Sequence, residues 1–108
     1  MYVGSPDAAK KFASTLRKKS RAWQGADAWL APSFPLIAPI AAALKGSSIK
    51  VGAQTISSHA EGAHTGEVSA AMLKASGASF ALVGHSERRA HGETDEIVRA
   101  QLTAALSS

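Results

Sequence analysis

Apolar residues along the chain recur at two different spacings, which predict helices that alternate with strands. Between Pro6 and Ser20 they repeat every three or four positions, and Ser5 is a preferred residue at a helix start. Because Pro39 is tolerated only in the first turn of a helix, the next helix is expected to begin late, near Leu36. Comparable signals predict the remaining helices: from Leu36 to Gly46, over 70–77, and after Thr94.

Three short apolar runs separate these helices, and each ends at a proline, a glycine or a polar residue. They cover residues 26–32, 48–54 and 79–84 and predict three strands. Strands that alternate with helices pair in parallel through right-handed crossovers, so we expect an α/β fold. A sheet of three strands leaves both of its edges open. We therefore interpret residues 1–108 as a single domain that is part of a larger α/β fold and incomplete at both ends.

Polar residues follow each predicted strand, at the positions where ligands of such folds bind. Ser33, Gln54 and His85 mark these three positions, and they are expected to lie on one rim of the fold. Between the second strand and the helix at 70–77, residues 55–69 form a polar stretch of fifteen residues that contains glycines. A loop of this length in a small domain is usually functional or disordered.

His85 is the strongest candidate for chemistry, because it lies directly after the third strand and before a run of charged residues. We expect Ser86 to cap a short helical turn that extends through Arg89. A helix N-terminus disfavours a positive charge, so His85 is expected to stay neutral and able to donate a hydrogen bond to a carbonyl. The spacing alone is equally compatible with a histidine that makes only local hydrogen bonds. Arg88 and Glu93 can form an ion pair that holds this turn to the last helix.

Composition and charge narrow the classes of function. The chain is 45% hydrophobic and 19% charged, which is ordinary for a globular domain, and its net charge is +4. A basic run lies at the end of the first helix, where cations are favourable, and aromatic residues do not alternate with it. Its members are Arg17, Lys18, Lys19 and Arg21. This pattern favours a solvated helix end over a surface that binds nucleic acid.

The sequence also argues against a metal site and against a membrane span. It contains no cysteine, and His59, His64 and His91 lack the spacing of a zinc site, so we expect no metal and no cofactor. No apolar run approaches the roughly 18 residues that cross a bilayer. We therefore expect a cytoplasmic protein without a membrane partner.

Several longer motifs together resemble those of the triosephosphate isomerase family. They are GHSERR at 84–89 followed by GETDEIV at 92–98, VGAQ at 51–54 followed by EGAHTGEVSAAMLK at 61–74, and APSFP at 31–35. The resemblance extends over essentially the whole chain. It implies a partial (β/α)8 TIM barrel, in which the predicted strands are the second to fourth parallel strands and the helices are the first to fourth.

The resemblance also implies an activity and the residues that carry it. The family interconverts dihydroxyacetone phosphate and glyceraldehyde 3-phosphate through an enediol, in glycolysis and gluconeogenesis and without a cofactor. His85 matches the electrophile that polarises the substrate carbonyl, and Glu87 matches a carboxylate that supports a catalytic lysine. The family forms homodimers in which one loop, with its threonine, reaches the partner's active site. The residues that match this interface are Gln54, Thr65, Gly66 and Glu67.

The chain departs from the family pattern at positions that bear on activity. Met1 matches the residue just after the family's lysine, and no residue matches its glutamate base. The segment between Arg89 and His91 is about one residue shorter than in the family, which is expected to displace Glu93. His64 replaces a more usual aromatic or apolar residue. We therefore expect the 108 residues to be inactive alone, and a non-catalytic half-barrel that acts as an interaction module is the alternative. A third interpretation, a small phosphate-binding domain, has no support, because the sequence has no glycine-rich phosphate loop.

Overall fold

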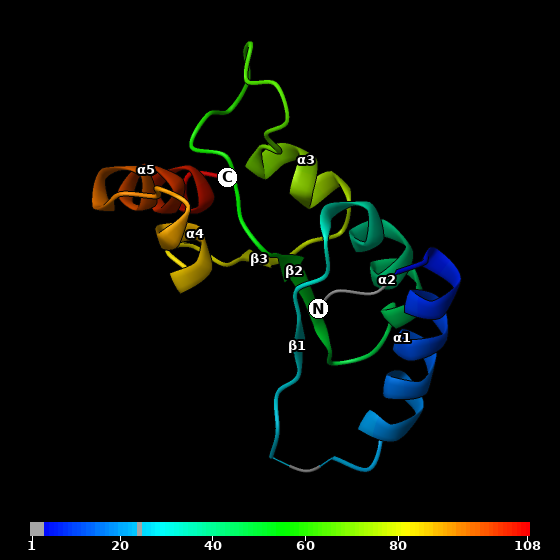
Figure 1. The fold of residues 1–108 in the computed structure, drawn as a ribbon. Coiled ribbons are helices and arrows are strands. Elements are labelled where there is room, and N and C mark those ends of the chain that lie inside the picture. The colour runs from blue at the N-terminus through cyan, green and yellow to red at the C-terminus, as the bar shows by residue number, and fades with distance from the viewer. Residues whose placement is uncertain (1–3, 24) are drawn as a thin grey trace.

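The computed structural model describes residues 4–23 and 25–108, so the expectation attached to Met1 lies outside it. Helices alternate with strands along the chain, as the sequence predicts (Figure 1). In chain order the elements are α1 (Pro6–Ser20), β1 (Trp29–Leu30), the 3-10 helix η1 (Phe34–Leu36), α2 (Ile37–Leu44), β2 (Lys50–Ala53), α3 (Ala70–Ala75), β3 (Phe80–Ala81), α4 (Ser86–Ala90) and α5 (Asp95–Leu106).

Local signals fix where the helices begin. The Ser5 hydroxyl accepts a hydrogen bond from the N–H of Ala8 at 3.2 Å, and Thr94 caps α5 in the same way. These bonds satisfy donors that the first turn of a helix leaves without a partner. Because η1 precedes α2, the α-helix starts only at Ile37. Pro39 therefore lies in the first turn of α2, where its missing N–H costs no helical hydrogen bond.

The strands form a parallel sheet in the order β1-β2-β3, which confirms the predicted α/β fold. Trp29 pairs with Lys50 on one side of β2, and Gly52 pairs with Phe80 on the other. The apolar runs predict longer strands, at 26–32, 48–54 and 79–84, and those lengths are wrong. The central β2 has 4 residues, whereas the edge strands β1 and β3 have 2 each. Residues that flank the short edge strands make a few further hydrogen bonds to β2, and an edge strand has a neighbour on one side only.

One face of the sheet packs against helices and forms the core. Successive side chains of a strand point to opposite faces, so Val51 and Ala53 share a face, and both are buried. α1 and α2 cover this face (Figure 1). The helical members of the core are Ala9 and Ala13 of α1, Leu36 of η1, Ile37, Ile40 and Leu44 of α2, and Leu73 of α3. The small alanines of α1 allow the two helices to approach closely.

The opposite face of the sheet is open and carries large apolar side chains. The rings of Trp29 and Phe80 lie 4.9 Å apart, and the Lys50 ammonium lies 4.7 Å from the Trp29 ring. Trp29 remains 54% exposed, although it is one of the largest apolar residues. Gly52 lies on this face, and the Phe80 ring covers the position of its missing side chain. A Cβ atom at Gly52 would lie 2.5 Å from the Phe80 carbonyl oxygen and 2.6 Å from its ring.

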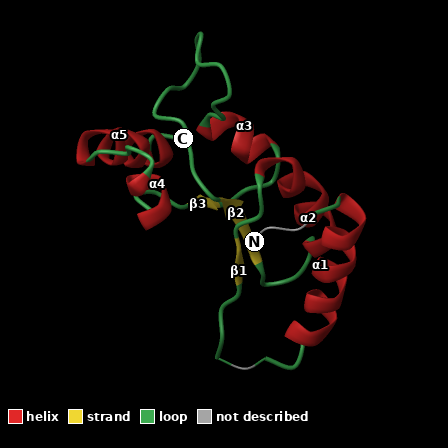
Figure 2. Cartoon of the chain, viewed as in Figure 1, coloured by secondary structure: helices red, strands yellow, loops and turns green. Residues whose placement is uncertain are grey.

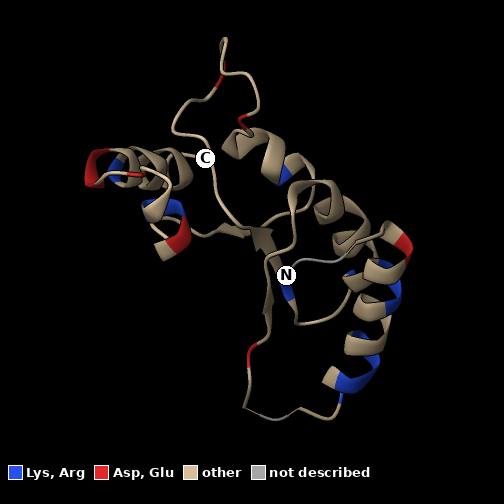
Figure 3. Ribbon diagram, in the orientation of Figure 1, with Lys and Arg blue, Asp and Glu red and all other residues tan. Residues whose placement is uncertain are grey.

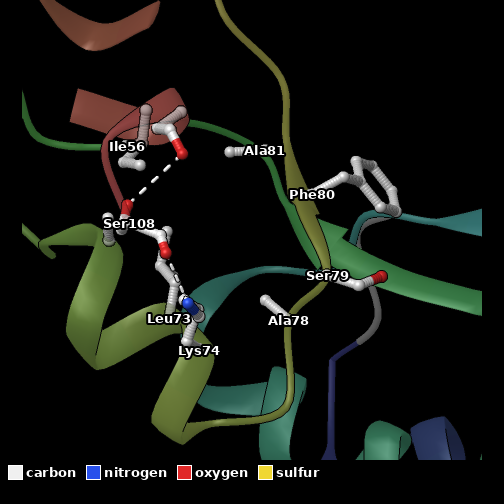
Figure 4. Close-up of a pocket in the computed structure, with 10 residues that line it drawn as sticks. Ile56, Leu73, Lys74, Ala78, Ser79, Phe80, Ala81 and Ser108 are labelled. Atoms are coloured by element: carbon white, nitrogen blue, oxygen red, sulfur yellow. Dashed lines mark hydrogen bonds between the residues drawn. The ribbon is translucent and has the colours of Figure 1, made fainter. Parts of the chain in front are cut away.

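The end of the chain joins the fold near α3 and β3. A pocket of about 420 Å³ lies there, and apolar side chains such as Ile56, Leu73 and Ala81 line it. At its edge the Lys74 ammonium donates a hydrogen bond to the backbone carbonyl of Ser108 (Figure 4). α5 meets the rest of the molecule at this pocket and through its contacts with α4.

The close approach at Gly52 leads to a first prediction. Replacing Gly52 with alanine should lower the free energy of unfolding by about 1–3 kcal/mol, because the methyl group must push β3 away from β2. Gly4→Ala is the matched control, since a Cβ atom there meets no atom within 4 Å. Urea unfolding followed by circular dichroism measures both variants. Equal midpoints for the two variants would show that the close contact at Gly52 does not affect the stability of the sheet.

Candidate active site

A tight turn after β3 delivers His85 to the rim of the sheet. Gly84 has a φ of +66°, a left-handed conformation that side chains disfavour. A Cβ atom there would also lie 3.2 Å from a methyl group of Val98. Arg89 donates a hydrogen bond to the Gly84 carbonyl at 3.2 Å, which fixes the turn from the other side. The chain thus passes from the end of β3 at Ala81 to the start of α4 at Ser86 over four residues.

His85 itself caps α4, so the expectation that Ser86 is the cap is wrong. The N–H of Glu87 donates a hydrogen bond to Nδ1 of His85 at 3.3 Å. Because Nδ1 accepts this bond, Nε2 is the ring nitrogen that can donate to a ligand in this arrangement. The side chain is 49% exposed, so Nε2–H can reach a ligand. The sequence did not reveal this cap, because histidine is not among the preferred capping residues.

His85 and Glu87 line a pocket of about 550 Å³ at the carboxyl ends of the strands. Gln54 lines the same pocket, and its side-chain amide donates a hydrogen bond to the Ala31 carbonyl at 3.0 Å. The structure thus places Gln54 beside His85 rather than on the loop that contains Thr65. Glu87 is 85% exposed, and its carboxylate lies 3.9 Å from Nδ1 of His85, the nitrogen that accepts the hydrogen bond from the Glu87 N–H. The remaining lining residues are Trp29, Leu30, Ala31, Leu82 and Arg88.

Behind this pocket, a buried carboxylate joins α4 to α5. Arg88 donates a hydrogen bond from Nε to Oε1 of Glu93 at 2.8 Å, its Nη2 lies 2.8 Å from the same oxygen, and Gln101 donates to that oxygen at 3.0 Å. Burial raises the pKa of Glu93. The hydrogen bonds from Gln101 and Arg88 and the charge of Arg88 together lower it by more, so the pKa of Glu93 lies below its ordinary value. The shorter segment after Arg89 therefore leaves Glu93 within reach of Arg88.

The loop between β2 and α3 projects away from the sheet and the helices (Figure 2). Thr65, Gly66 and Glu67 are exposed on it. A hydrogen bond of 3.0 Å from the N–H of Ser57 to the Val68 carbonyl closes the base of the loop. Gly66 and Glu67 also line a pocket of about 330 Å³ together with Arg88 and Glu93. The structure thus brings these two loop residues to the ion pair, while Thr65 stays at the outer part of the loop.

The basic residues of α1 and the other histidines lie outside this site. The cations of α1 lie on its outer side and toward its end, and Arg17 donates to the Ala43 carbonyl at 3.5 Å (Figure 3). His91 follows α4, and its Nδ1 lies 2.6 Å from the Glu87 carbonyl. His59 and His64, which are separated in sequence, stack on each other in the projecting loop. The spacing of the two histidines in the sequence did not predict this contact.

Within residues 4–23 and 25–108, none of the helices combines the length and the apolar character needed to cross a membrane.

Comparisons with known proteins agree on one family. The model of the triosephosphate isomerase family matches residues 1–108. A triosephosphate isomerase of Carboxydothermus hydrogenoformans is 42% identical over 104 residues, which are 95% of this chain and 41% of that protein. The triosephosphate isomerase of Afipia carboxidovorans is 49% identical over 84 residues, which are 77% of this chain and 34% of that protein.

A solved structure matches as well. The crystal structure of triosephosphate isomerase from Bartonella henselae superimposes with a TM-score of 0.84 and 33% sequence identity. The match covers 97% of this chain and 44% of that chain, so the sheet and its helices correspond to part of a TIM barrel. The aligned residues span 34% and 41% of the two curated relatives named above.

The buried carboxylate leads to the second prediction. Glu93→Gln should lower the free energy of unfolding by about 1–3 kcal/mol at neutral pH, because Arg88 loses a charged acceptor. The folded state holds the pKa of Glu93 below its ordinary value of 4.5. This contribution is therefore fully present above that value and is lost as the pH falls through the folded pKa. The difference between the two proteins should shrink below about pH 4.5.

Urea unfolding at a series of pH values measures this difference. Glu61→Gln, which removes the same charge from the exposed loop, is the control and should change stability by less than about 0.5 kcal/mol. A Glu93→Gln effect that stays constant down to pH 3 would contradict the assignment.

Proposed function

Since the chain belongs to the triosephosphate isomerase family, we propose that its residues act in the interconversion of dihydroxyacetone phosphate and glyceraldehyde 3-phosphate. This reaction removes a proton beside a carbonyl while an electrophile polarises that carbonyl. The position of His85 supports the second role, because Nδ1 caps α4 and the proton is left on Nε2. A neutral donor at the rim can bond the carbonyl oxygen and stabilise the developing enediolate. The reaction belongs to glycolysis and gluconeogenesis and takes place in the cytoplasm.

Glu87 acts beside His85 as a supporting carboxylate. Its side chain lines the same pocket and is 85% exposed, so it is accessible to a cation. The lysine that it supports in the family matches none of the 108 residues, and neither does the glutamate base. Both must come from the rest of a complete barrel. Arg88 and Glu93 serve this site indirectly, because their ion pair holds α4 against α5.

The projecting loop serves a second role, as the contact between two copies of a complete barrel. Thr65 is exposed at the outer part of the loop, and the pocket beside His85 is open. In a two-fold dimer each loop can enter the pocket of the other copy. Gln54 lies in that pocket, so Thr65, Gly66 and Glu67 would approach it across the interface. In such a dimer Gln54 and the loop residues would form one interface, although they lie apart in a single copy.

A non-catalytic interaction module remains the second candidate. The feature that favours it is the open face of the sheet, where Trp29 is 54% exposed and Leu82 is 39% exposed. The remaining strands of a barrel would cover this face, but so would another protein. The two candidates differ in activity, which the next experiment measures.

The third prediction concerns His85 in a complete barrel. The 108 residues replace the matching segment of the Carboxydothermus hydrogenoformans relative, and turnover of glyceraldehyde 3-phosphate is measured in a coupled assay. His85→Gln should lower kcat by roughly two or more powers of ten, the range expected for a general acid–base group. His91→Gln, which changes a histidine at the far end of α4, should retain kcat within about threefold.

Three outcomes would decide against the assignment. Unchanged turnover in His85→Gln, with a normal circular dichroism spectrum, removes His85 from the mechanism. The 108-residue chain assayed alone is expected to be inactive, and turnover within about tenfold of the chimaera would show that the missing base and lysine are not needed. An inactive chimaera that is well folded would favour the interaction module.

The fourth prediction concerns the loop. Thr65→Arg in the same chimaera should dissociate the dimer, because the interface would bury a charge without a partner. Thr15→Arg introduces the same side chain on the exposed side of α1 and should leave the dimer intact. Sedimentation velocity at micromolar concentration measures both. A dimer that persists in Thr65→Arg would place the interface elsewhere.

A further inference from the structure

Two histidines and a glutamate meet in the projecting loop, outside the pocket that contains His85. The rings of His59 and His64 stack with their centroids 3.6 Å apart and an angle of 6° between their planes. Each of His59, His64 and Glu67 offers one ligand atom, and these three atoms all lie within 4.8 Å of one another. All three side chains are exposed, so an ion can reach them from solvent.

A network of hydrogen bonds holds the three residues in place. The buried Ser57 hydroxyl donates a hydrogen bond to Oε2 of Glu67 and accepts one from the N–H of His59 at 3.0 Å. The N–H of Glu67 donates to the His64 carbonyl, also at 3.0 Å. One buried hydroxyl thus orients the carboxylate and anchors the backbone of the first histidine. Metal sites use such a second layer of hydrogen bonds to orient their ligands.

The three donors have the chemistry of a transition-metal site. Imidazole nitrogens suit zinc, nickel and copper, whereas magnesium and calcium prefer ligand sets made only of oxygen. Two histidines with one glutamate are a known ligand set for zinc, with a water molecule as the fourth ligand. We propose that His59, His64 and Glu67 form a binding site for a divalent transition-metal ion, with Ser57 as its outer hydrogen-bond partner.

The stacked arrangement predicts how binding changes the loop. Zinc binds nitrogen at about 2.0–2.1 Å, so two donors in a tetrahedral site lie roughly 3.4 Å apart. Donors that lie as far apart as 4.8 Å would therefore have to move closer when they bind one ion. The lone pair of an imidazole nitrogen lies in the plane of its ring, so two stacked, parallel rings cannot both point at one ion. At least one ring must rotate, which exposed side chains do readily. Binding should therefore break the His59–His64 stack.

This site is independent of the isomerase assignment. His59 and His64 do not line the pocket that contains His85, and the test measures binding to the 108-residue chain rather than activity. Glu67 is the one residue that the site shares with the proposed dimer contact. The binding test can therefore contradict the metal site, and the activity test the isomerase assignment, each without the other.

The test is a titration of the chain with Zn²⁺, followed by calorimetry and by NMR of the histidine ring protons. The wild type should bind one ion per chain, and the ring signals of His59 and His64 should shift together. His64→Phe keeps a flat ring that can stack but lacks a ligand atom, and it should weaken binding at least tenfold, as should Glu67→Gln. Ser57→Ala should weaken binding by about 10–100-fold, the range for second-layer partners. His91→Phe is the matched control and should bind like the wild type.

Three results would overturn the proposal. Equal affinity in the wild type and in His64→Phe would exclude the pair of histidines. Displacement of Zn²⁺ by an equal concentration of Mg²⁺ would show a simple carboxylate contact. Binding of the same strength in urea, where circular dichroism shows an unfolded chain, would mean that histidines bind the ion without the structure of the loop.

Discussion

The pairing of β2 with β3 at Gly52 is the constraint on which the site depends. No side chain fits between the strands there, because the carbonyl and the ring of Phe80 occupy the space. Hydrogen bonds from Ser79 to Val51 at 2.7 Å and from Leu82 to Ala53 at 2.9 Å extend the pairing on both sides. With β3 fixed in this register, the turn at Gly84 sets where His85 emerges, on the same rim as Gln54. A shift of β3 would carry the histidine away from the pocket.

At this rim, the residues that hold His85 in place lie on the short helix that follows it. His85 uses one ring nitrogen to cap α4 and keeps the other for a ligand, so the helix both positions the ring and leaves Nε2 as the donor. α4 has 5 residues and would not be stable alone. The Arg88–Glu93 ion pair ties it to α5, and Gln101 adds a hydrogen bond from inside that helix. The geometry of His85 therefore depends on a carboxylate that never touches it.

The sequence predicted the parts of this structure that depend on neighbouring residues. α1 has the predicted bounds, and the Thr94 cap and the late start of α2 are confirmed, because caps and prolines act within one turn. Strand lengths were wrong because a strand ends where its partner ends, and the partner is distant in sequence. The Gln54 side chain and the His59–His64 contact were missed for the same reason. The roles of His85, Glu87 and the loop came from a resemblance to a family, and they remain proposals.

The loop from Ser57 to Val68 carries two proposed uses that oppose each other. Docking into a partner would pack the loop against a surface, and a packed ring cannot rotate toward an ion. Glu67 would also have to serve the interface and the metal at once. A metal ion that binds only the undocked loop stabilises the separated copies by mass action, by about 2.7 kcal/mol per loop at 100 times its dissociation constant. Because linkage is reciprocal, docking must in turn oppose metal binding. The exposed histidine pair would thus make association of the barrel sensitive to transition metals, through residues that contact neither the substrate nor His85.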